Sequence, residues 1–116
     1  MNRTAITILG SLVLGTAHAH AHAFLDHAEP RVGNSVTSAP REVSLWFTQN
    51  LEAAFSAVEV HDAGGARVDQ GKPQISAGVM RIGLKPLPPG TYKVYWHVLS
   101  VDTHRTEGSF SFRVGQ

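Results

Sequence analysis

The segment that decides the fold class is Tyr92-Lys93-Val94-Tyr95-Trp96-His97-Val98-Leu99. Val94, Trp96 and Val98 alternate with Lys93, Tyr95 and His97, so an extended chain here has one apolar face and one face toward water. Glu107–Val114 shows the same alternation and follows after a short loop, residues 100–106. The two segments therefore predict neighbouring strands of a sheet, with the loop at one end.

Three shorter runs rich in β-branched and aromatic residues precede this pair: Glu42–Thr48, Phe55–Asp62 and Val79–Leu84. Turn signals separate the runs; these are Glu29-Pro30, Gly33-Asn34, Ala39-Pro40, Ala63-Gly64-Gly65, Gly71-Lys72-Pro73 and Pro86–Gly90. No stretch after residue 21 has a helical period, and Leu51–Phe55 predicts one helical turn at most. Parallel strands need long crossovers, for which there is no room. We therefore expect an all-β domain of six or seven antiparallel strands in a two-sheet sandwich.

Residues 1–21 have the parts of a cleaved secretory signal. Arg3 supplies the positive charge, Ala5–Leu14 the apolar stretch, and Ala19-His20-Ala21 the small-residue cleavage site. The apolar stretch is shorter than the roughly 20 residues of a transmembrane helix. An uncleaved anchor or a buried helix is the alternative. The expected division is a signal peptide over residues 1–21 and one exported domain over residues 22–116.

The composition of the exported domain excludes several classes of site. The chain has no cysteine, which excludes disulfides, thiolate metal ligands and cysteine nucleophiles. Without Arg3, the ten Lys and Arg residues become nine and equal the nine Asp and Glu residues. A nucleic acid or an anionic membrane would require a basic excess, so neither is an expected partner.

Two separate pieces of sequence carry candidate metal ligands. Cleavage after Ala21 would make His22 the N-terminus, where its α-amine and imidazole can chelate one ion. Cleavage after Ala19 would instead free His20 and leave His22 third, an arrangement that also suits copper. Asp102 and His104 lie two residues apart in the loop, so an extended backbone would direct both side chains the same way. Nitrogen and oxygen donors in a tetragonal arrangement suit Cu(II).

Each piece alone is weak evidence for a metal site. Asp102-Thr103-His104 is also typical of a solvated turn, in which the Thr103 hydroxyl braces the loop. His27 and His97 are expected on the surface, although a contribution of either to a metal site stays open. Trp46, Phe47 and Trp96 are expected in the core. The combination of an N-terminal histidine, the loop pair and an exported β domain without cysteine favours copper.

Several motifs resemble the CopC family of periplasmic copper-binding proteins. The motifs are Ala19-His20-Ala21 before His22-Ala23-Phe24-Leu25, Leu45–Leu51, Gly90–Trp96, Ser100-Val101-Asp102-Thr103-His104, and Gly108–Phe112. The resemblance covers essentially all of residues 22–116. It implies an immunoglobulin-like Greek-key sandwich of about seven strands that binds one Cu(II) per chain through His22, Asp102 and His104. It further implies a periplasmic protein that sequesters copper or delivers it to a CopD-like inner-membrane transporter. We expect a monomer, with pairing through an exposed strand edge left open.

The sequence departs from the family pattern at two places. Members that also bind Cu(I) carry a Met- and His-rich insert, whereas residues 61–72 here contain no methionine. After processing only Met80 remains, and its alternation predicts a core position. Cu(I) prefers sulfur ligands, so no separate Cu(I) site is expected. Gln49 stands where members can have a glutamate near copper, which removes one weak oxygen contact.

Two other functions fit parts of the pattern. A copper-dependent oxidative enzyme can also use an N-terminal histidine, but it needs an open axial position and a broad substrate surface. A metal-free adhesion-type sandwich would not need His22. No catalytic motif of another class occurs, and we expect a binding protein rather than an enzyme.

Overall fold

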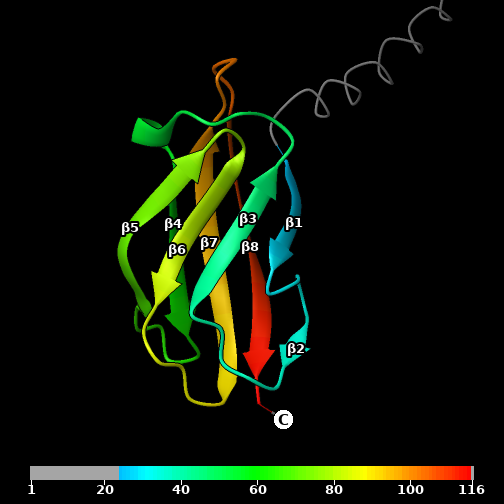
Figure 1. The fold of residues 1–116 in the computed structure, drawn as a ribbon, viewed down its shortest axis with the longest axis vertical. Coiled ribbons are helices and arrows are strands. Elements are labelled where there is room, and N and C mark those ends of the chain that lie inside the picture. Colours follow the sequence, from blue (N-terminus) through cyan, green and yellow to red (C-terminus); the bar gives the residue numbers. More distant parts are fainter. Residues whose placement is uncertain (1–23, 116) are drawn as a thin grey trace, which may run out of the picture.

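The structure, a computed structural model, describes residues 24–115. Its elements are β1 (Leu25–Glu29), β2 (Ser35–Val36), β3 (Glu42–Phe47), the 3₁₀ turn η2 (Ala53–Phe55), β4 (Ala57–Asp62), β5 (Asp69–Ser76), β6 (Val79–Leu84), β7 (Gly90–Leu99) and β8 (Arg105–Val114). The strands form two four-stranded sheets, β1-β3-β6-β5 and β2-β8-β7-β4, packed face to face (Figure 1). Among these residues no helix is long and apolar enough to cross a membrane. The expected all-β sandwich is confirmed.

The core lies between the sheets and follows the alternation of the sequence. Its buried side chains include Val43, Leu45, Phe47, Val58, Val60, Met80, Ile82, Leu84, Val94, Trp96, Val98, Phe110, Phe112 and Val114. Phe47 and Trp96, from opposite sheets, meet edge to face with ring centroids 5.0 Å apart. Full burial of one such side chain stabilises the fold by about 1.5–3 kcal/mol. Met80 is 0% exposed, as its alternation predicted.

Trp46 is where the core prediction is wrong. Val43, Leu45 and Phe47 of β3 point inward, so Trp46 faces outward and is half-buried. The imidazole of His27 stacks on its ring at 4.4 Å, and the Arg81 guanidinium lies 5.8 Å from the ring centroid. The His27 and Arg81 side chains thus cover the Trp46 ring on the outer face of the sheet, so this large aromatic residue does not need a place in the core.

Three of the strands were not among the runs that the sequence indicated. β1 and β2 are short, and β2 pairs in parallel with the end of β8 through Ser35 and Val36, an exception to the expected antiparallel pairing. β5 contains Gly71-Lys72-Pro73, which predicted a turn. The strand lies at a sheet edge, and its register against β6 shifts between Gln70 and Gln74. An edge irregularity tolerates a proline without an N–H, which explains why a strand forms there.

The long β7–β8 hairpin determines where the candidate ligands lie. Its register is continuous from Gly90 opposite Val114 to Leu99 opposite Arg105, and the connecting turn projects beyond one end of the sandwich (Figure 1). The β3–β4 connection meets this turn, since Val101 N donates to Asn50 O at 3.0 Å. The hairpin thus presents its turn at a solvent-facing end of the fold.

Candidate metal centre

The turn that carries Asp102 and His104 is closed rather than extended. Ser100 N donates to His104 O at 2.9 Å, and Thr103 N donates to Ser100 O at 2.8 Å. Thr103 has φ +71°, in the left-handed region that a non-glycine residue rarely adopts. The argument that alternate residues of an extended chain point the same way was therefore wrong here. The Thr103 hydroxyl donates to the carbonyl of Asp102 and so braces the turn locally.

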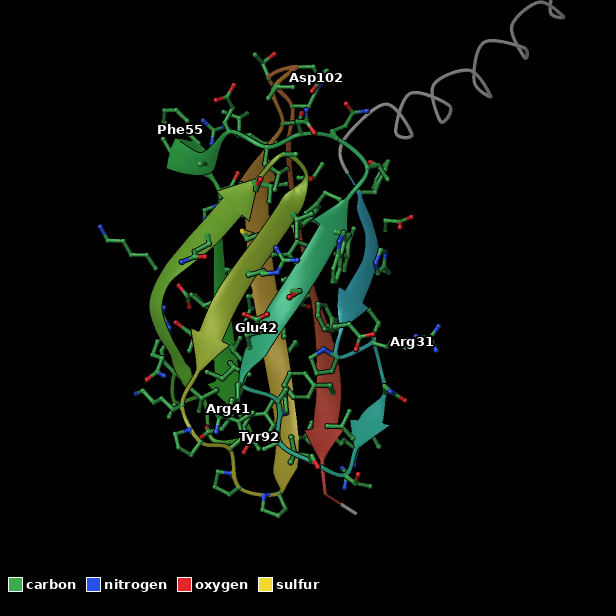
Figure 2. All side chains as sticks on the ribbon, in the orientation of Figure 1. Arg31, Arg41, Glu42, Phe55, Tyr92 and Asp102 are labelled. Atoms are coloured by element: carbon green, nitrogen blue, oxygen red, sulfur yellow. The ribbon has the colours of Figure 1, made fainter. Side chains whose placement is uncertain are left out.

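The turn nevertheless brings the two expected side chains together. Asp102 Oδ1 and His104 Nδ1 lie 3.4 Å apart, and the side chains are 43% and 46% exposed. Two donors about 2.0 Å from one metal ion lie roughly 2.8 Å apart at a right angle and roughly 4 Å apart when opposite. The observed separation lies between these limits, so one carboxylate oxygen and one imidazole nitrogen can share an ion. Figure 2 shows Asp102 at the tip of the turn, facing solvent.

The surroundings of Asp102 favour its ionised form, which is the form that binds metal. The hydroxyl of Ser100 donates to Asp102 Oδ1, and this bond, followed by the interaction with His104, lowers the pKa of the carboxyl below its usual range. From the sequence, Ser100 was predicted only to belong to the motif Ser100–His104, without a role of its own. A hydroxyl residue two positions before an aspartate in a loop is a signal for such a contact.

Within residues 24–115, no group of three His, Cys, Asp or Glu side chains is placed to hold a metal ion. Among these residues, the Asp102–His104 pair therefore brings together two candidate ligands. The third predicted ligand, His22, lies outside the described residues, as does the predicted boundary at residue 21.

The point at which the described chain begins lies at the same end as the turn. Phe24 N donates to Thr48 Oγ1 at 2.9 Å, and Thr48 N donates to Phe24 O, also at 2.9 Å. Two residues later, Asn50 O accepts from Val101 N, next to Asp102. The segment Thr48–Asn50 thus connects the start of the described chain with the turn. Phe24 is therefore linked to the turn of Asp102 and His104 through hydrogen bonds at both ends of Thr48–Asn50.

Two other histidines in the described part, His27 and His97, have different neighbours. The imidazole of His27 stacks on Trp46, and its Nδ1 lies 2.7 Å from Asp26 Oδ2. His97 is exposed on the outer face of β7, opposite Glu107 of β8. Both side chains thus lie on outer faces of the sheets, in agreement with the surface positions that the sequence predicted.

Comparison with known proteins gives a consistent result. Residues 25–115 match the family model described as the CopC domain. Protein YobA of Escherichia coli strain K12 is 35% identical over 97% of this chain and 93% of its own length. Copper transport protein CutJ of Bacillus subtilis is 31% identical over 99% of this chain, which spans only 22% of CutJ. The crystal structure of PcoC, described as a methionine-rich copper resistance protein from Escherichia coli, matches with a TM-score of 0.72 and 32% identity over 81% of this chain and 99% of that chain.

Proposed function

Because this chain belongs to the CopC family, whose members are copper-binding resistance proteins and not enzymes, we propose that it binds Cu(II) in the periplasm. One ion per chain is held by His22, Asp102 and His104, and residues 1–21 are removed on export. The observation that carries the proposal is the 3.4 Å separation of the Asp102 carboxylate from the His104 imidazole, at the end where the described chain begins.

His22 stands two residues before Phe24, and this position makes it the third ligand of the proposal. Two residues of backbone span at most about 7 Å when extended, and they separate His22 from Phe24. Phe24 is bonded to Thr48, in the segment that connects to the turn. An α-amine and an imidazole from His22 would join one carboxylate oxygen and one imidazole nitrogen, a set of three nitrogens and one oxygen. This donor set is typical of tetragonal Cu(II).

The sulfur content of the chain supports Cu(II) rather than Cu(I) as the bound form. The chain has no cysteine and two methionines, of which Met80 is buried in the core. Cu(I) prefers thiolate and thioether ligands. A separate Cu(I) site is therefore not part of the proposal.

The experiment is a Cu(II) titration of natively exported protein whose N-terminus has been sequenced. A type-2 EPR signal with nitrogen couplings should saturate at about one equivalent, and His104→Ala should abolish it because one nitrogen ligand would be lost. His97→Ala, which removes an exposed imidazole from another face, is the matched control and should bind normally. A mature N-terminus without histidine among its first three residues would contradict the proposal. Unchanged binding in His104→Ala would also contradict it, and normal copper tolerance of cells producing His22→Ala would favour a metal-free sandwich.

Delivery of copper to a membrane transporter is the second part of the proposal. CutJ, a copper transport protein, contains a region similar to this whole chain joined to a much larger remainder. Transfer of a bound ion requires the surface around its ligands to contact the receiving protein. Val101, which precedes Asp102 in the turn, is 50% exposed. Phe55 is 57% exposed and lies at the same end of the fold as Asp102 (Figure 2), so a partner would find two apolar anchors there.

The matched comparison for delivery is Val101→Ser against Val32→Ser. Both valines are similarly exposed, at 50% and 58%, but Val32 follows Arg31, away from Asp102 in Figure 2. Loss of one apolar anchor at an interface should slow copper transfer to native membrane vesicles about tenfold in Val101→Ser. Val32→Ser should transfer normally, and both variants should retain wild-type Cu(II) affinity. Equal transfer rates in the two variants would contradict docking through the turn end.

A further inference from the structure

Ser100 is a buried polar residue directly beneath the exposed ligand pair. It is 0% exposed, whereas Asp102 and His104 are close to half exposed. Its backbone forms an isolated bridge to Leu51 in the β3–β4 connection, which fixes the base of the turn to the body of the sandwich. A buried hydroxyl is retained at little cost only where its hydrogen-bonding groups have partners.

The partners of this hydroxyl are parts of the two proposed ligands. Ser100 Oγ is bonded to Asp102 Oδ1, and it also lies 3.2 Å from His104 O and 3.4 Å from His104 N. A hydroxyl has one proton to donate, and an ionised carboxylate is a stronger acceptor than a carbonyl. The Ser100 hydroxyl therefore donates its hydrogen bond to Asp102 Oδ1, and its oxygen can still accept a hydrogen bond from His104 N.

We propose that Ser100 is a positioning residue for the metal site, since its buried hydroxyl holds the Asp102 carboxylate beside the His104 imidazole. This inference rests on the proposed function. Asp102 is exposed, and without the bond to Ser100 its carboxylate would keep only the 3.4 Å contact with His104 and would be less ordered. Binding of the ion would then have to order the side chain. Residues that orient metal ligands typically change metal affinity about 10- to 100-fold when they are removed.

The test is Cu(II) affinity, measured by competition with a chelator, in the natively processed Ser100→Ala protein. We expect an affinity loss of at least about tenfold together with a changed copper hyperfine coupling in the EPR spectrum. The control is Ser56→Ala. Ser56 is also buried, and its hydroxyl donates to Glu52 O at 2.9 Å and accepts from Leu99 N at 3.1 Å. This control should lower the melting temperature similarly but leave the affinity unchanged.

A double-mutant cycle with Asp102→Ala separates positioning from a general effect on folding. If Ser100 acts through the carboxylate, Ser100→Ala should have no further effect on Cu(II) affinity once Asp102 is alanine. Its effect on the melting temperature should remain. An equal affinity loss in both backgrounds, or wild-type affinity in Ser100→Ala, would overturn the role of Ser100 alone. Failure of the unaltered, natively processed protein to bind Cu(II) would overturn the proposed function as well.

Discussion

A form of the protein with one extra methionine before His22 should bind Cu(II) about a thousandfold more weakly than the natively processed form. The extra residue converts the α-amine of His22 into a peptide nitrogen, so the terminal chelate loses one of its two donors. The imidazole remains, together with Asp102 and His104, whose arrangement in the turn does not depend on the N-terminus. Competition against a chelator of known affinity measures the difference.

The matched control for the extended form is the same protein after enzymatic removal of the methionine. Its affinity should return to that of the exported chain. The pH dependence gives a second check, because an α-amine with a pKa of about 7.7–8.0 has to lose its proton to bind the ion. The affinity of the processed form should therefore fall as the pH decreases from 8 to 6, more steeply than that of the extended form. Equal affinities of the two forms would show that the amine is not a ligand.

The sequence was sufficient for the parts of the fold in which burial alternates cleanly. In β7, the side chains of Val94, Trp96 and Val98 all point into the core, as their period of two indicates. β5 could not be predicted in this way, because Pro73 lies at the sheet edge where the register against β6 shifts, and no regular alternation marks such a segment in the sequence. Trp46 shows a related limit, since the alternation of β3 turns it outward and its partial burial comes from His27 and Arg81 on the two neighbouring strands.

The candidate site likewise has one part that the sequence predicts and one part that it does not. The donor types at Asp102 and His104 are visible in the sequence, and they indicate nitrogen and oxygen ligation. Their separation depends on the left-handed conformation of Thr103 and on the buried hydroxyl of Ser100, which a simple spacing rule does not contain. The extended-chain argument therefore anticipated that Asp102 and His104 lie close together, but for an incorrect geometric reason. Tertiary contacts, not local spacing, determine the position of the turn beside the β3–β4 connection.

A buried aspartate, Asp69, links the two sheets along their common edge, where it pairs with the exposed Arg67. The Asp69 side chain, 4% exposed, accepts hydrogen bonds from Arg67 Nε at 3.0 Å and Nη2 at 2.7 Å. It also accepts from Val60 N, in β4 of the other sheet, at 2.8 Å. Burial raises the pKa of the Asp69 carboxyl, but the bonds from Arg67 and Val60 together outweigh burial and hold it below its usual value. The charged form of Asp69 therefore stabilises the folded state.

Asp69→Asn should lower the free energy of unfolding at pH 7 by about 2 kcal/mol. The amide oxygen can still accept from Val60 N, and Arg67 is 54% exposed, so water replaces part of the lost ion pair. Because the folded pKa of Asp69 is depressed, its contribution is complete above the unfolded value of about 3.9 and is lost as the pH falls through the lower folded value. Urea denaturation at several pH values should therefore show a constant difference between wild type and variant above about pH 5, and a shrinking difference below it. Asp62→Asn, at an exposed turn where an amide oxygen can accept equally from Gly64 N and Ala66 N, should change stability by less than about 0.5 kcal/mol. A difference between wild type and Asp69→Asn that grows toward acid would reverse the sign of the argument and show that burial dominates at Asp69.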